Sequence, residues 1–165
     1  MDTIGEPRRA FYQILQQDDP TVIFDGTDQV FEPNPNAYIT TYTTHINAAK
    51  STAPSFNLNL NAVASANTGN LQISVLPADT FLHPSCRAFV EICQDSVSGF
   101  SKDFNYVARQ IYSFPLNIVY PDSLDTIINF THSMPVDKMT GVLFVQDINT
   151  KKVLQATKSK FTEDK

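Results

Sequence analysis

An alternation of apolar and polar residues is the strongest pattern in the chain. Between Phe56 and Ala64, apolar side chains occupy every second position. The positions between them include Asn57, Asn59 and Asn61. A period of two residues predicts a β-strand with one face in a core and the other in water. The turn-forming segment 66–70 and a second alternation over 71–75 then predict the partner strand of a hairpin.

Five more short strands are predicted further along the chain. They span 87–94, 105–113, 124–130, 141–147 and 152–157, and turn-rich segments separate them. About seven short strands over roughly 100 residues, without helices between them, are typical of an immunoglobulin-like β-sandwich. Segment 142–145 is apolar at consecutive positions, so its strand should be central and covered on both faces. We therefore expect a sandwich over residues 55–158.

The first part of the chain predicts a helix followed by a hairpin. Segment 6–17 has the pattern of a helix with one apolar face. The Asp-Asp-Pro sequence at 18–20 ends it, because proline cannot continue the hydrogen-bond ladder. Residues 21–24 form a short run with high strand propensity, 25–28 have the composition of a tight turn, and 29–31 predict the return strand.

A second helix is predicted from about residue 34 to residue 49. Tyr38, Tyr42 and Ile46 recur at spacings of four residues and would form one stripe along it. The period then changes from helical to extended, which predicts a boundary near 49–54. The expected fold class is α+β, mainly β, with a small helix–hairpin–helix unit at 1–50 ahead of the sandwich.

The composition is that of a globular protein without a basic surface for nucleic acid. The 165 residues are 42% hydrophobic and 18% charged, and the net charge at pH 7 is −5. Nucleic-acid binding requires clustered Lys and Arg, whereas most of the 12 basic residues are scattered. No apolar run approaches the roughly 20 residues of a membrane-spanning helix. The Lys-rich end, 159–165, is expected to be a frayed, solvated tail.

Cys86 and Cys93 are the only cysteines, and both belong to one predicted strand. Seven residues of extended chain would separate them by roughly 23 Å on opposite faces, beyond the limit of about 7 Å between the Cα atoms of a disulfide. The sequence contains no CxxC pair. We expect two buried, inert thiols rather than redox chemistry.

Other combinations of reactive residues are weak candidates. Zinc could recruit His83, Cys86, Cys93 and His132, but the spacing between His83 and Cys86 is loose. The turn 25–28 with Glu32 offers too few oxygens for calcium, which takes about six to eight. Ser85, near His83, lacks the surroundings of a catalytic nucleophile. We therefore expect no catalytic, cofactor-binding or metal site.

The order helix, proline-led strand, turn, short strand, helix resembles the C-terminal half of a thioredoxin fold. Pro20 matches the proline that is cis in that family and lies beside the redox site. The resemblance implies a first half with a CxxC helix, which this sequence does not contain, so Met1 could mark a truncation. The second interpretation of the chain is therefore a remnant of a thiol–disulfide protein of the envelope.

A second resemblance covers most of the chain. It rests on Pro-Thr-Val-Ile-Phe-Asp-Gly at 20–26 and on the Arg-Arg-x-x-Tyr segment at 8–12. It rests most specifically on the closing hairpin Phe-Val-Gln-Asp-Ile-Asn-Thr-Lys-Lys-Val-Leu-Gln-Ala at 144–156. These segments are similar to the twenty-eight-kilodalton outer-membrane protein family, found mainly among Bacteroidetes. The resemblance implies a thioredoxin-like unit followed by a β-sandwich, and an extracytoplasmic location, outer membrane-associated or secreted.

The missing half would leave a sheet edge and the helix stripes of the N-terminal unit uncovered. Exposed edges recruit other strands, so we expect a protein partner or self-association, with no nucleic acid and no membrane span. The candidate contact residues are Thr21, Val22, Ile23, Phe24, Tyr38 and Tyr42. The expected role is a non-enzymatic structural or interaction module of a bacterial envelope. A third interpretation is a carbohydrate- or protein-binding sandwich with its site in loops 78–85 and 95–103.

Overall fold

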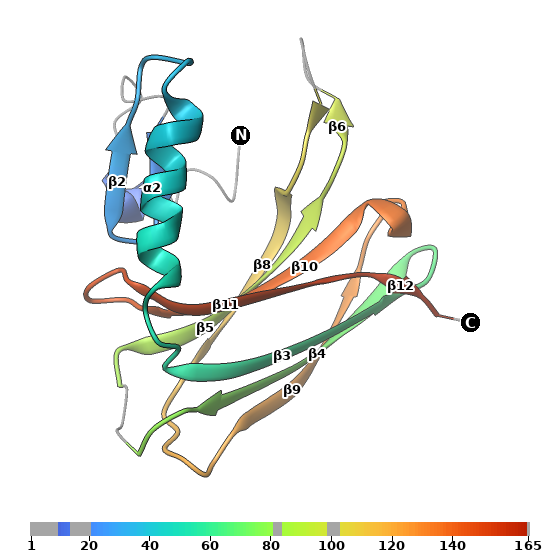
Figure 1. Ribbon diagram of the computed structural model, residues 1–165. Helices are drawn as coiled ribbons and strands as arrows, with labels where there is room; N and C mark the ends of the chain where they lie inside the picture. The colour runs from blue at the N-terminus through green and yellow to red at the C-terminus, as the bar shows by residue number, and fades with distance from the viewer. Residues whose placement is uncertain (1–9, 14–20, 81–83, 99–102, 165) are drawn as a thin grey trace.

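The computed structural model describes residues 10–13, 21–80, 84–98 and 103–164. Two four-stranded sheets form a sandwich, and a β-hairpin and an α-helix lie beside it (Figure 1). Strand residues far outnumber helical ones, which confirms the predicted α+β class with mainly β structure. Within the described ranges, no helix combines the length and the apolar character needed to cross a bilayer.

The first sheet has the strand order β11-β10-β5-β8 and is antiparallel throughout. Its strands are β5 (Cys86–Gln94), β8 (Val107–Pro115), β10 (Met139–Asp147) and β11 (Val153–Lys160). Leu143, Phe144 and Val145 of β10 are all buried, although consecutive side chains point to opposite faces of a strand. The prediction of a central strand that is covered on both faces is confirmed.

The second sheet has the order β12-β3-β4-β9. Its strands are β3 (Phe56–Ala64), β4 (Thr68–Pro77), β9 (Leu124–Thr131) and β12 (Thr162–Glu163), of which β12 is parallel to β3. Leu60 and Ile73 face the first sheet and are buried, whereas Asn59 and Gln72 are exposed. The alternation therefore gives this sheet a core face and an amide-rich outer face.

The hydrophobic core lies between the sheets and draws on both. Its most buried members include Leu71 and Val75 from the second sheet and Val90, Ile92 and Leu143 from the first. Two short strands, β6 (Val97–Ser98) and β7 (Asp103–Phe104), pair with each other and extend the β5–β8 hairpin beyond the sandwich (Figure 1). A 3-10 helix, η2 (Val136–Lys138), precedes β10.

The prediction of a frayed tail at 159–165 is wrong for residues 159–164, which the structure describes. β11 continues to Lys160, and the residues that follow Phe161 form β12. Phe161 is only 6% exposed and packs edge-to-face on Phe130, with ring centroids 5.6 Å apart. The sandwich therefore extends past its predicted end at 158. The lysine-rich composition suggested that this segment is solvated. The lysines instead lie on one face of β11, and Phe161, directly after the strand, packs in the core.

The N-terminal unit contains β1 (Thr21–Phe24) and β2 (Asp28–Phe31), an antiparallel hairpin as predicted, followed by α2 (Tyr38–Lys50). Asp25 and Gly26 in the turn have φ values of 51° and 77°. The helix begins later than predicted because residues 34–37 form a turn. The first predicted helix is seen at residues 10–12. The remainder of 6–17, and Pro20 with its expected cis bond, lie outside the described residues.

Candidate interaction surface

An aromatic cluster joins β1 to α2. The ring of Phe24 lies 5.5 Å from that of Tyr42 and stacks on the ring of His45 at 5.2 Å. Tyr38 stacks on Tyr42 with ring centroids 5.5 Å apart. The Nδ1 atom of His45 also pairs with the carboxylate of Asp28 on β2. Aromatic stacking and one polar pair therefore hold the hairpin against the helix.

The six predicted contact residues do not form one continuous surface. Phe24 and the two tyrosines come together in the aromatic cluster and are half-buried. Ile23 has the opposite parity on β1 and lines a hollow against the sandwich instead. Val22 is half-buried, and the side chain of Thr21 lies outside the described residues. Contact of this set with a partner stays a prediction.

The hairpin turn docks on the loop between β10 and β11. The N–H of Val153 donates to the carbonyl oxygen of Asp25 across 2.8 Å. Gly26 is buried, and a Cβ at this position would lie 1.9 Å from the carbonyl oxygen of Lys151. Glycine alone combines this close approach with a positive φ at little cost. The sandwich thus holds β1 at its turn end, while the second edge of β1 pairs with no other strand described here.

Gln146 is the polar centre of this junction. Its side chain is fully buried, and its Nε2 donates to the Lys151 carbonyl oxygen at 2.6 Å and to the Tyr12 hydroxyl at 2.7 Å. Buried amides are stable only when hydrogen-bonded, so these contacts fix the loop and the segment before β1 on the same strand. Sequence reasoning missed this role. The available signal was a glutamine that directly follows the apolar run 142–145.

A hollow of about 480 Å³ remains between the hairpin and the outer face of the first sheet. Ile23 lines it from the N-terminal unit, and Glu91 and Phe144 line it from the sandwich. Asp25 also contributes to its wall. Burial raises the pKa of Asp25, and the positive charge of Lys152 partly opposes that shift. The hollow therefore combines apolar and acidic side chains.

Asp147 fixes the β10–β11 loop. Its Oδ1 accepts hydrogen bonds from the N–H groups of Asn149 at 2.9 Å and Thr150 at 3.0 Å, and its Oδ2 accepts one from the Ser85 hydroxyl at 2.8 Å. The bond from Thr150 is the largest of the effects that lower the pKa of Asp147. Ser85, a weak candidate for a nucleophile, is thus engaged in holding the loop.

Both cysteine thiols are buried and unbridged, as expected. Burial, helped by the charge of Asp147, raises the pKa of Cys86 to about 11. Burial, helped by Glu91 and Asp95, raises the pKa of Cys93 to about 12. A thiol with such a pKa is almost entirely protonated near neutral pH, and the thiolate is the reactive form.

The candidate metal ligands that the structure describes do not converge on one site. Among the residues that the structure describes, no group of three His, Cys, Asp or Glu side chains could hold a metal ion. His132 hydrogen-bonds to a backbone carbonyl at 3.0 Å, Asp28 pairs with a histidine of α2, and Glu32 accepts from a threonine hydroxyl of α2 at 3.0 Å. His83 lies outside the described residues.

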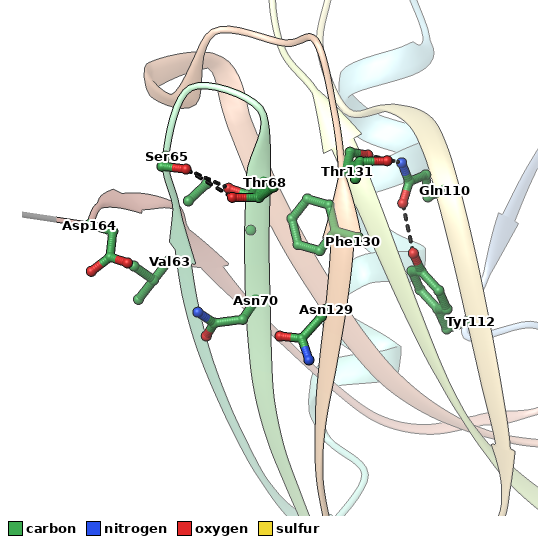
Figure 2. Close-up of a pocket in the computed structure, with 12 residues that line it drawn as sticks. Val63, Ser65, Thr68, Asn70, Gln110, Tyr112, Asn129, Phe130, Thr131 and Asp164 are labelled. Carbon is green, nitrogen blue, oxygen red and sulfur yellow. Dashed lines mark hydrogen bonds between the residues drawn. The ribbon is translucent and has the colours of Figure 1, made fainter.

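A second hollow, of about 570 Å³, lies at the end of the second sheet (Figure 2). Asn70 of β4 and Asn129 of β9 are cross-strand partners that line it. The Oδ1 of Asn70 is buried and accepts no hydrogen bond from any residue in the described ranges. On the other side, Gln110 donates to the carbonyl oxygen of Thr131 at 2.8 Å and accepts from the Tyr112 hydroxyl at 2.7 Å. This Oδ1 atom is shielded from solvent, so the polar groups that the hollow itself presents are those of its other lining residues, such as Asn129 and Gln110.

Comparison with known proteins finds similarity at the level of structure. No family model and no curated protein matches the sequence. The fold is similar to HBP35 of Porphyromonas gingivalis, with a TM-score of 0.71 and 11% identity, over 95% of this chain and 57% of the HBP35 chain. A domain of the outer membrane lipoprotein Omp28 from Porphyromonas gingivalis matches with a TM-score of 0.43 and 13% identity, over 69% of this chain and 93% of that chain. The likeness to HBP35 shows a shared fold across both units, whereas the likeness to Omp28 is too distant to carry an argument.

Proposed function

We propose that the chain is a non-enzymatic structural and interaction module of a bacterial cell envelope, located outside the cytoplasm. The observation that carries this proposal is the docking of the hairpin turn on the β10–β11 loop. Gly26, Gln146 and Lys151 hold two small units in one orientation, so that the surface of α2 is presented on a fixed scaffold. Preorganisation of a contact surface lowers the entropic cost of assembly with a partner.

The same proposal places the chain with the twenty-eight-kilodalton outer-membrane family, as a thioredoxin-like half followed by an immunoglobulin-like sandwich. The strand order β11-β10-β5-β8 corresponds to G-F-C-C′ of immunoglobulin-like domains, and β3-β4-β9 corresponds to A-B-E. The order β1-β2-α2 is that of the end of a thioredoxin fold. The likeness to HBP35 over both units also supports the combination.

The proposed partner surface consists of the second edge of β1 and the exposed side of α2. On the helix, Ile39 is 84% exposed next to the stacked tyrosines. Addition of a partner strand to β1 would supply main-chain hydrogen bonds, and the neighbouring aromatic and apolar side chains would supply specificity.

Site-specific photo-crosslinking in the encoding bacterium tests this function. A photoreactive residue at Val22 or Ile39 should give a covalent adduct with another protein in the envelope or secreted fraction. The same residue at Asn59, on the outer face of the second sheet, is the control. Adducts from position 59 alone, or a chain confined to the cytoplasmic fraction, would contradict the proposal.

The competing thiol–disulfide function has a direct test. The purified chain should not catalyse reduction of insulin disulfides by dithiothreitol, because the thiols of Cys86 and Cys93 are buried with raised pKa values. Catalysis that disappears when both cysteines are replaced by serine would overturn the non-enzymatic proposal.

A second candidate function is the binding of a neutral carbohydrate, which the hollow in Figure 2 favours. Asn70 and Asn129 line the hollow as cross-strand partners, and side-chain amides both donate and accept hydrogen bonds. This site lies on a sheet face rather than in the predicted loops. Glycan-array binding that is lost in Asn70→Ala but kept in Asn57→Ala, at the other end of the face, would support it. Equal binding by the two variants, or none by the wild-type chain, would exclude this site.

A further inference from the structure

Most edge strands of the sandwich carry devices that prevent pairing with another chain. β11 carries Lys158 and Lys160, and its register against β10 shifts once. β8 carries the exposed Arg109, ends in Pro115 and pairs with β5 through another register shift. β12 is only two residues long. Charge, proline, irregular register and shortness are the usual protections of a sheet edge.

β9 has fewer of these protections, since Asp125 near its start is its one charged residue. It pairs with β4 over eight consecutive positions without a register shift. Segment 126–131 contains neither a charged residue nor proline, and it is rich in β-branched and aromatic residues. Ile127, in its centre, is 59% exposed. A long, regular edge whose last six residues carry no charge is a template for another strand unless one already covers it.

Two hydrogen bonds show which backbone groups of β9 point away from β4. The N–H of His132, directly after the strand, donates toward β4 to the carbonyl oxygen of Asn67 at 2.9 Å. The carbonyl oxygen of the preceding residue, Thr131, accepts from the Gln110 side chain of the other sheet. Backbone groups alternate between the two edges of a strand. The residues with groups on the free edge are therefore Asp125, Ile127, Asn129 and Thr131.

We infer that β9 pairs antiparallel with β9 of a second copy of this chain, joining the two second sheets into one continuous sheet. A two-fold axis at Ile128 places Asp125 opposite Thr131 of the second copy, and Ile127 opposite Asn129 of the second copy. This register pairs all the free-edge residues, as the symmetry of an isologous dimer requires.

In this register the edge of β9 is complementary to itself, so we expect its partner to be β9 of a second copy of the chain. No like charges face each other, and each Asp125 carboxylate meets a threonine hydroxyl that can donate to it. The interface uses no residue of β1 or α2. The dimer interface can therefore coexist with the partner surface of the proposed function. An experiment that rejects one of these two proposals leaves the other standing.

Sedimentation of the full chain tests the inference. The wild-type chain should approach twice its mass of 18.4 kDa with increasing concentration. Ile127→Pro removes an N–H from the free edge but none from the β4 ladder, so the fold should tolerate it. It should weaken the dimer about thirtyfold, because one hydrogen bond is lost from each copy.

A matched pair of charged variants separates the edge from the sheet face. Ile127 and Gln72 are cross-strand neighbours on the same outer face, but Gln72 belongs to the inner strand β4. Ile127→Lys should abolish the dimer, whereas Gln72→Lys should leave it intact, with circular dichroism confirming that both variants are folded. A wild-type chain that stays monomeric up to about 200 µM would overturn the inference. Equal loss of the dimer in both lysine variants would also overturn it.

Discussion

Replacing Gly26 with alanine should undock the N-terminal unit from the sandwich. The new Cβ would lie 1.9 Å from the carbonyl oxygen of Lys151, at a residue whose φ is 77°. That carbonyl cannot move alone, because the side chain of Gln146 donates to it at 2.6 Å. The nearby N–H of Val153 donates to Asp25, so a shift of the loop disturbs this bond as well.

The size of the effect follows from these contacts. A left-handed backbone with a Cβ costs about 1 kcal/mol. The two disturbed hydrogen bonds, from Gln146 and Val153, contribute about 1 kcal/mol each. The docking free energy should therefore fall by about 3 kcal/mol. If the chain unfolds as one unit, its melting temperature should drop by about 6–12 °C.

Hydrogen exchange at the Val153 amide measures docking directly. This amide should exchange about 150-fold faster in Gly26→Ala, whether or not the sandwich melts with the N-terminal unit. Thr27→Ala is the control, because Thr27 is an exposed neighbour in the same turn and its change should stay within about 0.5 kcal/mol. Wild-type exchange at Val153 together with an unchanged melting temperature in Gly26→Ala would refute the close approach of the turn to Lys151.

Phe161→Ala should lower the free energy of unfolding, measured in urea, by about 3–5 kcal/mol, because the ring is buried. A change below about 1 kcal/mol would favour the frayed tail that the sequence predicted. Cys86 and Cys93 should react with a thiol reagent at about pH 8 only after denaturation, because burial raises both pKa values; rapid reaction of the native chain would contradict their burial. Asp95 and Asp147 have folded pKa values below the ordinary 3.8, so the stability they supply is complete above that pH and is lost as the pH falls through the folded values. Asp147→Asn should reduce the loss of the free energy of unfolding at acidic pH. An unchanged pH dependence would show that the loop contacts of Asp147 do not contribute to stability.

The strands were largely predictable from sequence because the signal for a half-buried strand is local. Every second residue of β3 enters the core, so the alternation from Phe56 to Ala64 gives the strand bounds that the structure shows. The inner position of β10 follows in the same way from an apolar run on both parities. The helix start was misplaced because 34–37 form a turn without an apolar pattern to mark its end.

The rest of the fold depends on contacts between distant parts of the chain, which no local pattern reports. The parallel pairing of β12 with β3 depends on Phe161, whose flanking lysines and acidic residues suggest solvent. The candidate contact residues were predicted as a strand edge and an aromatic stripe, and strand parity turns Ile23 toward the sandwich while Phe24 faces α2. Neighbours on one strand thus belong to different interfaces.

The three segments that carry the family resemblance meet at one place in the fold. Asp25 and Gly26 end the first segment, and Lys151 and Val153 of the closing hairpin receive them. Tyr12, from the third segment, accepts the hydrogen bond from Gln146 of the same hairpin. These residues form a joint between the two units. Proteins that share these segments should therefore share the relative orientation of their two units, whatever chemistry the remainder of each chain performs.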